Sequence, residues 1–321
     1  MTESRRRRNH VTKVVDESTD IDLAVASYLR NCELRNLTKN TTNSYRDALH
    51  ELTLLLGDIG VQIPRDITKA HISIVIDNKR KTRINRGIGE YPSDQTINKL
   101  IRTWRAFFNY LVEEGHLAQS PMSKLGAIRS EKRIIETFTD DQLRMLFDAP
   151  NKKTFTGYRD YVIMSTLLDT GVRISELERL DLSDINWADR ILRVYGKGRK
   201  ERFVPFSRRL EKMLRTYLEL RGSLSTEALF VNIDDKRFKS RGMQQTIKNY
   251  GDITGIKGVR CSPHTFRHTC AKLYIMNGGD AFSLQKLLGH ESLVVTRMYV
   301  NLFSQDLSKQ HQKFSPLDNL R

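Results

Sequence analysis

The chain has 321 residues, of which 39% are hydrophobic, so it can fill the cores of about two domains and is not a wholly disordered protein. Its 54 Lys and Arg against 38 Asp and Glu give a formal net charge of +16. The longest apolar run, residues 161–168, is too short to span a bilayer, and polar residues follow the basic N-terminal run where a signal peptide would be apolar. We therefore expect a cytoplasmic protein.

The positive charge is shared between the two halves of the chain. Residues 1–130 hold 21 basic and 15 acidic residues, and residues 131–321 hold 33 and 23. A polyanion bound between two basic domains fits this distribution, and nucleic acid is the first candidate. Charge alone also fits ribosomal proteins and proteins that bind membrane surfaces.

The N-terminal half is predicted to be helical. Residues 1–19 are polar and predict a flexible basic arm, although an inert solvated tail fits equally well. The spacing of apolar residues then predicts four helices, over about 20–35, 39–56, 68–78 and 93–114, which form a compact binding module over residues 20–119. A basic loop, residues 79–86, separates the last two helices. The candidate DNA-binding residues of the arm and the loop are Arg5, Arg6, Arg7, Arg8, Lys79, Arg80, Lys81, Arg83 and Arg86.

The C-terminal half is predicted to be a second domain. Residues 120–137 are polar and without periodicity, as in an interdomain linker, and a capping-box pattern at residues 139–142 opens the domain, which extends to residue 321 with a C-terminal tail. Residues 190–206 predict a β-hairpin, and residues 181–187 can add a third strand. The expected fold is mainly α, with two domains forming a clamp and a small antiparallel sheet in the second.

The first candidate site is a turn between two helices. An apolar helix ends at Gly171, and Arg173 and Glu176, three residues apart, share a face of the next helix. An arginine at such a turn can bind a phosphate through two hydrogen bonds while the glutamate holds its guanidinium. An ordinary surface ion pair is the alternative.

The second candidate site is the tip of the hairpin. Glycines on both sides of Lys197 allow a close backbone approach to a ligand and leave the lysine projecting, where it can donate a proton or neutralise a phosphate. Arg199 and Lys200 follow as further DNA-binding candidates. A solvated basic tip is the alternative.

The third candidate site is the start of a helix capped by Ser262 and Pro263. His264 and Arg267 share a face in its first turns, where the helix dipole favours an anion and disfavours a protonated imidazole, so we expect His264 to be neutral. His268 lies one turn after His264, but the glutamate of a zinc-binding H-E-x-x-H motif is missing, so we expect no metal there. The three cysteines form no C-x-x-C pair, and we expect them to be reduced and structural.

The fourth candidate site lies near the C-terminus. A helix is predicted to stop at Gly289, His290 follows at the turn, and Ser292 caps a new helix that carries Tyr299. A buried tyrosine of the core is the ordinary interpretation of such a residue.

The order of these motifs is more specific than any one of them. The sequences G-V-R-I-S-E-L, G-K-G-x-K-E-R, H-T-F-R-H-T, and L-L-G-H followed nine residues later by Tyr, occur in turn. The chain thereby resembles the tyrosine recombinase (phage-integrase-like) family, closest to its simple Xer-type two-domain members. The resemblance to the catalytic pattern covers about residues 138–303, and the N-terminal helices are similar to that family's core-binding domain. The six catalytic positions of the family are filled by Arg173, Lys197, His264, Arg267, His290 and Tyr299.

The resemblance implies a DNA strand transferase that uses no cofactor and no metal. Tyr299 would attack the scissile phosphate, forming a 3′-phosphotyrosyl link and freeing a 5′-hydroxyl. Arg173 and Arg267 would bind the non-bridging oxygens, where charge develops, and Glu176 would support Arg173.

The remaining roles that the resemblance implies concern protons and the phosphate. Lys197 would protonate the departing 5′-oxygen, and His264 would assist proton transfer at the tyrosine. His290 would donate a hydrogen bond to the phosphate.

The implied partner is double-stranded DNA with paired half-sites, bound by a homotetramer, with an accessory DNA-bending protein or a partner recombinase as a further possibility. The reaction would serve integration, excision or resolution of a mobile element or replicon. A type IB-like topoisomerase would use similar chemistry as a monomer, and the tail at residues 303–314, if it docks on a neighbouring protomer, distinguishes the two. A non-catalytic DNA-binding relative is disfavoured by the intact catalytic set.

Overall fold

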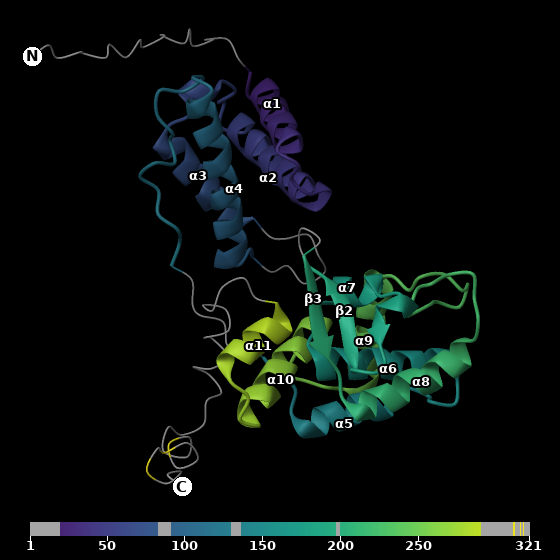
Figure 1. The fold of residues 1–321 in the computed structure, drawn as a ribbon. Helices are drawn as coiled ribbons and strands as arrows, with labels where there is room; N and C mark the ends of the chain where they lie inside the picture. Colours follow the sequence, from purple (N-terminus) through teal and green to yellow (C-terminus); the bar gives the residue numbers. More distant parts are fainter. Residues whose placement is uncertain are drawn as a thin grey trace, which may run out of the picture. The chain divides into compact units, whose positions relative to one another are not determined.

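The computed structural model describes residues 20–82, 91–129, 136–196 and 200–289, together with residues 311, 315 and 317. The chain divides into two compact units, residues 1–133 and 134–321 (Figure 1). No helix within the described ranges combines the length and apolar character needed to cross a membrane. The arm with Arg5 to Arg8 lies outside the described residues.

The N-terminal unit contains the four helices that the sequence predicts. They are α1 (Ile21–Leu34), α2 (Lys39–Gly57), α3 (Lys69–Lys81) and α4 (Asp94–Glu113), with a short 3-10 turn, η1 (Pro64–Asp66), before α3. Each α-helix begins after a residue whose side-chain oxygen accepts a hydrogen bond from a backbone N–H of the first turn, and these caps are Asp20, Thr38, Thr68 and Ser93. The four predicted helices are confirmed. They could be predicted from the sequence because apolar spacing and capping residues are both local signals.

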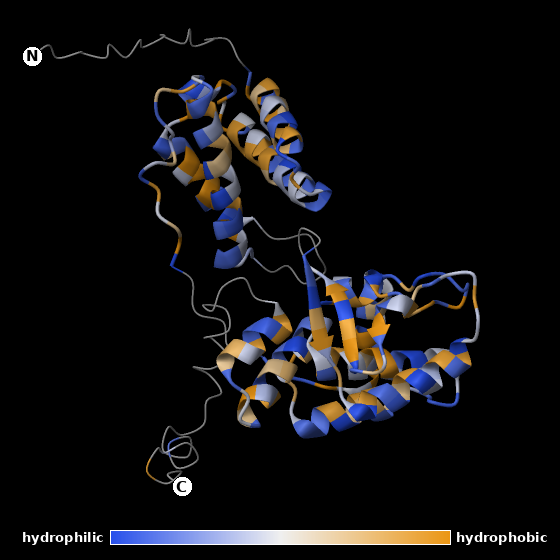
Figure 2. Cartoon of the chain, in the orientation of Figure 1, coloured by the Kyte–Doolittle hydropathy of each residue, from blue (hydrophilic) through white to orange (hydrophobic). Residues whose placement is uncertain are grey.

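The core of the N-terminal unit is built on α4. Trp104, Phe107 and Phe108 are fully buried on one face of this helix, and Figure 2 shows that the helices carry hydrophobic and hydrophilic residues on different faces. The indole N–H of Trp104 donates a 2.9 Å hydrogen bond to the carbonyl of Ala48, which ties α4 to α2. Residues 120–129, the first part of the expected linker, also pack on α4: Met122 is fully buried in this core.

The predicted basic loop at 79–86 begins later than expected. Lys79, Arg80 and Lys81 form the last turn of α3, because Lys and Arg are good helix formers and cations are favoured at a helix C-terminus. Their charges meet carboxylates of the same unit. The pairs are Lys79 with Glu51, Arg80 with Asp94 at 2.6 Å, and Lys81 with Asp77 at 3.7 Å. Arg83 and Arg86 lie outside the described residues.

The C-terminal unit is a helical domain with one small sheet. Its elements in chain order are α5 (Asp140–Asp148), α6 (Phe155–Thr170), α7 (Ile174–Arg179), η2 (Leu182–Asp184), β1 (Ile185–Asn186), β2 (Ile191–Tyr195), β3 (Glu201–Pro205), α8 (Arg208–Arg221), α9 (Ser240–Thr254), α10 (Pro263–Met276) and α11 (Ala281–Leu288). The predicted capping box is present, with Thr139 and Gln142 bonded to each other's backbone N–H groups. The mainly helical fold with a small sheet is confirmed.

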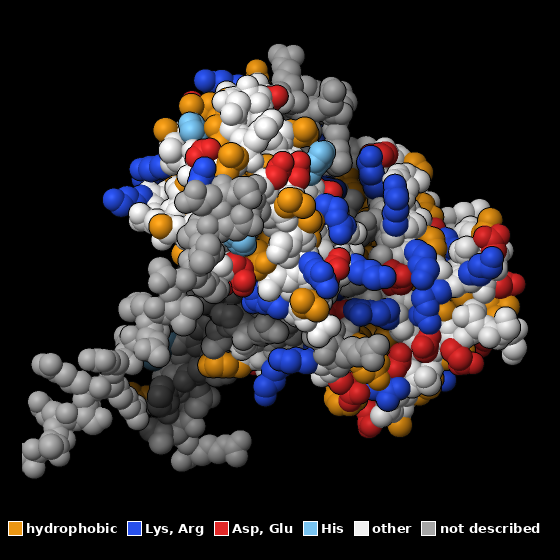
Figure 3. Space-filling view, turned by 90° about the horizontal axis from the view of Figure 1, so that it is seen from above, with side chains coloured by type: hydrophobic (Ala, Val, Ile, Leu, Met, Phe, Trp, Pro, Cys, Tyr) orange, Lys and Arg blue, Asp and Glu red, His pale blue; other side chains and the backbone are white. Residues whose placement is uncertain are grey.

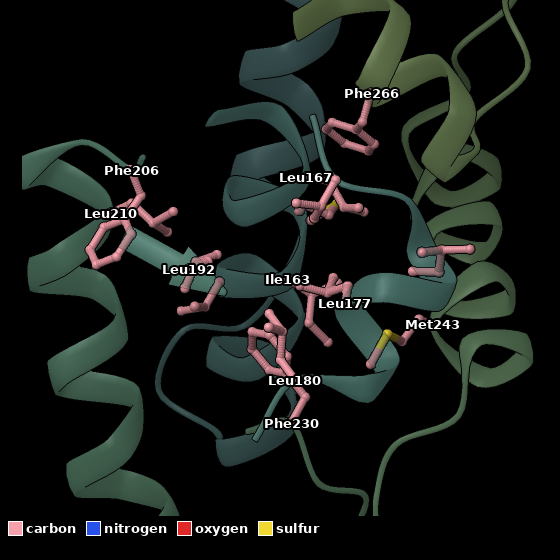
Figure 4. Close-up of a cluster of buried hydrophobic side chains, with 14 of the residues drawn as sticks. Ile163, Leu167, Leu177, Leu180, Leu192, Phe206, Leu210, Phe230, Met243 and Phe266 are labelled. Atoms are coloured by element: carbon pink, nitrogen blue, oxygen red, sulfur yellow. The ribbon is translucent and has the colours of Figure 1, made fainter. Parts of the chain in front are cut away.

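The sheet is antiparallel in the order β1-β2-β3, so the predicted hairpin and third strand are both present. Its inner face, with Leu192, Val194 and Val204, is buried. Figure 4 shows part of the core to which this face belongs, in which Ile163 and Leu167 of α6 lie with Leu192 of β2 and side chains from other helices. This core holds α6, α7 and the start of α10, and a smaller cluster packs Leu284 and Leu288 of α11 against α10. The candidate site is built from the ends of these helices.

Candidate active site

The turn between α6 and α7 places Arg173 beside Glu176. Gly171 ends α6 in the left-handed conformation (φ 61°), and Arg173 is the N-cap of α7. The backbone N–H of Arg173 donates to Oε2 of Glu176 (2.8 Å), and its guanidinium Nη1 donates to Oε1 (3.1 Å). The pair is not an ordinary surface ion pair, because Glu176 is only 2% exposed.

A second arginine, which the sequence analysis did not single out, binds the same carboxylate. Arg202 of β3 donates from Nη1 to Oε1 of Glu176 (2.7 Å) and from Nη2 to Oε2 (2.8 Å). Burial by itself raises the pKa of Glu176, but the hydrogen bonds and charges of Arg202 and Arg173 outweigh it and hold the pKa below its ordinary value. Glu176 is therefore an ionised carboxylate in the interior. The signal in the sequence was the last residue of the G-K-G-x-K-E-R motif.

Helix α10 brings the second predicted arginine to this place. Ser262 caps the helix by accepting from the N–H of Thr265 (3.3 Å), and Pro263 occupies its first position, as predicted. Arg267 is 4% exposed and donates to the carbonyl of Gly171 (2.6 Å). The guanidinium of Arg267 thus lies against the turn that leads into Arg173.

His264 is exposed at the start of the same helix, and its pKa is lowered as predicted. The cause differs from the predicted helix field: partial loss of solvent around the ring acts first, followed by the charges of Arg267, Arg173 and Arg260. His268 has a lowered pKa for similar reasons, and the two rings lie 6.5 Å apart between centroids. A neutral imidazole beside two arginines can accept a proton.

The C-terminal end of α11 gathers all three arginines. Its last carbonyls accept one guanidinium hydrogen bond each: Leu287 from Arg202 (3.3 Å), Leu288 from Arg267 (2.7 Å) and Gly289 from Arg173 (3.3 Å). Gly289 ends the helix in the left-handed conformation (φ 64°), as predicted. The negative end of a helix dipole thus faces three cations, and the next residue in the chain is His290.

The predicted residues Lys197, Arg199, His290 and Tyr299 lie outside the described residues, as does most of the tail that was expected to distinguish the two enzyme classes. Lys200 is described and exposed, and its carbonyl accepts a hydrogen bond from the N–H of Gly196 (2.8 Å). This bond holds together the two residues, Gly196 and Lys200, that flank the segment with Lys197. The structure brings together Arg173, Glu176, His264 and Arg267 of the predicted set.

All three cysteines are free thiols, and burial raises the pKa of Cys270 to about 12. Among the described residues, no three His, Cys, Asp or Glu side chains form a group that could hold a metal ion.

Comparison with known proteins shows the family to which the chain belongs. The phage integrase family matches residues 136–306, more than half of the chain. The tyrosine recombinase XerD of Staphylococcus epidermidis is 29% identical over 302 residues, which cover 91% of this chain and 98% of that protein.

Two solved structures have a similar fold. A lambda integrase dimer bound to a COC′ core site has a TM-score of 0.72 at 18% identity and covers 88% of this chain and 77% of that one. A lambda integrase tetramer bound to a Holliday junction has a TM-score of 0.71 at 19% identity and covers 90% and 83%. With this family matched over residues 136–306 and the arginine motifs brought to one place, the chain belongs to the phage integrase family of tyrosine recombinases.

Proposed function

We propose that this protein is a site-specific DNA recombinase that cuts and rejoins DNA strands through a 3′-phosphotyrosyl intermediate. The observation that carries this proposal is the convergence of Arg173 and Arg267. The two residues are far apart in the chain, yet they donate to adjacent carbonyls at the end of α11. Paired guanidinium groups match the geometry of a phosphate and stabilise the charge that develops on it during transfer.

The cleavage step uses residues of this chain alone. Tyr299 Oη forms a bond to phosphorus as the bond to the 5′-oxygen breaks. The tyrosine proton passes toward His264, whose lowered pKa favours the neutral, accepting form, while Lys197 gives a proton to the departing oxygen. His290 donates to the phosphate. The 5′-hydroxyl of a partner strand then attacks the phosphotyrosine and releases the enzyme.

The charge of the chain supports double-stranded DNA as the substrate. Both halves are positive, and Figure 3 shows many exposed Lys and Arg side chains, with acidic ones among them. In this proposal the two units close on the duplex as a clamp, and a homotetramer joins paired half-sites, with an accessory DNA-bending protein or partner recombinase where the site requires one. The lambda integrase tetramer bound to a Holliday junction is consistent with this assembly.

The test is a covalent adduct between the full-length protein and DNA. Duplexes selected from a random-sequence library for binding are incubated with the protein in EDTA, and adducts that survive denaturing electrophoresis are counted. The wild type is expected to form the adduct and to join the cut strand to a labelled partner duplex.

Tyr299→Phe is expected to bind the same duplex without forming an adduct, whereas the matched control Tyr274→Phe forms it normally. An adduct with Tyr299→Phe, or one that requires added magnesium or zinc, overturns the proposal, and relaxation without strand exchange indicates a topoisomerase.

A further inference from the structure

We infer that Arg202 is a positioning residue of the recombinase site: it neutralises the buried Glu176 so that the charge of Arg173 stays available for the DNA phosphate. This inference rests on the proposed function and adds a residue to its machinery. Arg202 lies on β3 opposite Val194 of β2. Its side chain is only 15% exposed, against 38% for Arg173, so Arg202 faces the interior while Arg173 faces the solvent side of the site.

The first argument is the geometry of the carboxylate. Each oxygen of Glu176 accepts two hydrogen bonds: one from Arg202 and one from Arg173. The bonds from Arg202 form the parallel two-point pair that is the strongest arrangement between guanidinium and carboxylate. Arg173 uses its backbone N–H for one of its two bonds, so only one side-chain bond of Arg173 goes to Glu176.

The second argument is the balance of charge. A buried carboxylate without a cationic partner is strongly unfavourable. If Arg173 were the only partner of Glu176, its positive charge would be neutralised before DNA bound. With Arg202 present, the cluster of one carboxylate and two guanidinium groups keeps one net positive charge, and it lies on the more exposed Arg173.

The third argument is the place of Arg202 between three parts of the site. Its Nε donates to the carbonyl of Leu287 near the end of α11. Its side chain also lies against Gly289, where an added Cβ would stand 2.9 Å from Cδ and Nε of Arg202. The same strand follows the hairpin tip that carries Lys197. Arg202 therefore links that hairpin, the Glu176–Arg173 pair and the helix end that precedes His290.

The experiment measures single-turnover adduct formation on the duplexes selected above, with Arg202→Met, Arg202→Lys, Glu176→Gln and the double variant Arg202→Met with Glu176→Gln. Misplaced catalytic groups cost on the order of 10²-fold in rate, and we expect a loss of this size for Arg202→Met at unchanged DNA affinity. Arg202→Lys keeps the charge without the two-point geometry and is expected to lose less. The double variant is expected to cleave faster than Arg202→Met, because removing the carboxylate's charge releases Arg173.

Lowering the pH gives a second measure. Without Arg202, Glu176 binds a proton more readily, so the rate of Arg202→Met relative to wild type is expected to rise as the pH falls. Arg193→Met is the matched control, since Arg193 lies on the neighbouring strand and pairs with Asp184 instead (3.0 Å). A merely structural role would give no recovery in the double variant and no such pH dependence.

The outcomes separate the inference from the function on which it rests. If the wild type forms the adduct and Arg202→Met forms it at the same rate, or if the double variant is slower than Arg202→Met, the inference is overturned and the function stands. If the wild type forms no adduct, both are overturned. If thermal unfolding shows that Arg202→Met does not fold, Arg202→Lys replaces it. The adduct rates of Arg202→Lys with and without Glu176→Gln are then compared in the same way.

Discussion

The guanidinium of Arg267 donates a 2.7 Å hydrogen bond to the carbonyl of Leu288, the last residue of α11. This bond joins the start of α10 to the end of α11, and a second bond from Arg267 reaches the carbonyl of Gly171 at the end of α6 (2.6 Å). The buried side chain of Arg267 thus connects the start of α10 with the ends of α6 and α11.

Gly171 is predicted to be more sensitive to substitution than another glycine in the same conformation. Gly171→Ala and Gly255→Ala both place a side chain in the left-handed region (φ 61° and 66°), which costs about 1–2 kcal/mol each. A Cβ at Gly171 would also stand 2.7 Å from Leu288 Cδ2, whereas nothing lies within 4 Å at Gly255. We expect Gly171→Ala to lose about 1–3 kcal/mol more in urea unfolding, and only Gly171→Ala to slow DNA cleavage. Equal losses in the two variants would contradict the close approach to Leu288.

Lys197 is predicted to act as the proton donor. Proton donation by a positioned group contributes ~10²–10⁴-fold, so Lys197→Ala is expected to cleave a normal substrate slower by this factor. Sulfur in place of the bridging 5′-oxygen leaves without a proton, and it is expected to restore most of the rate.

Restoration by sulfur should be specific to the residue that donates the proton. Arg173→Ala is expected to be restored poorly because its charge acts on the non-bridging oxygens. If sulfur does not restore Lys197→Ala, the lysine is a phosphate contact and the acid is another group, with His264 the next candidate.

The two histidines of α10 are predicted to make stability depend on pH. Loss of solvent and neighbouring positive charge lower the pKa of His264 and His268 below 6.5 in the folded state. The unfolded chain therefore binds more protons just below that pH, and the free energy of unfolding should fall as the pH drops through this value. Urea unfolding at about pH 7.5 and about pH 5.5 measures the effect. The variant with both His264→Gln and His268→Gln should show a smaller fall, and an unchanged fall would assign the dependence to other groups.

The C-terminal tail is predicted to act in assembly. Removing residues 304–321 should leave binding to a single half-site nearly unchanged, because the proposed DNA contacts precede the tail. Cooperative binding to paired half-sites should decrease, since the tail is proposed to dock on a neighbouring protomer. Band-shift titrations with single and paired half-sites measure both quantities. Unchanged cooperativity would favour assembly without the tail, or the topoisomerase alternative.

Local signals in the sequence determined most of the secondary structure. Apolar spacing and capping residues such as Ser93 and Thr139 act within one or two helical turns, so they can be read without the fold. The pairing of Arg173 with Glu176 was predictable for the same reason, since residues three apart share a helix face. The resemblance to the recombinase family added the order of the motifs, and with it the expected function.

Contacts between distant segments were decided only by the tertiary structure. The motif marks Arg202 but does not indicate that it binds Glu176, because the bond depends on how the sheet packs beside α7. The lowered pKa of His264 is of the same kind, since its largest cause is burial in the folded chain and Arg173 from another element adds to it. The ion pairs that Lys79 forms with Glu51 and Arg80 forms with Asp94 likewise join residues brought together by packing. Electrostatic interactions act through space, and only the folded chain sets those distances.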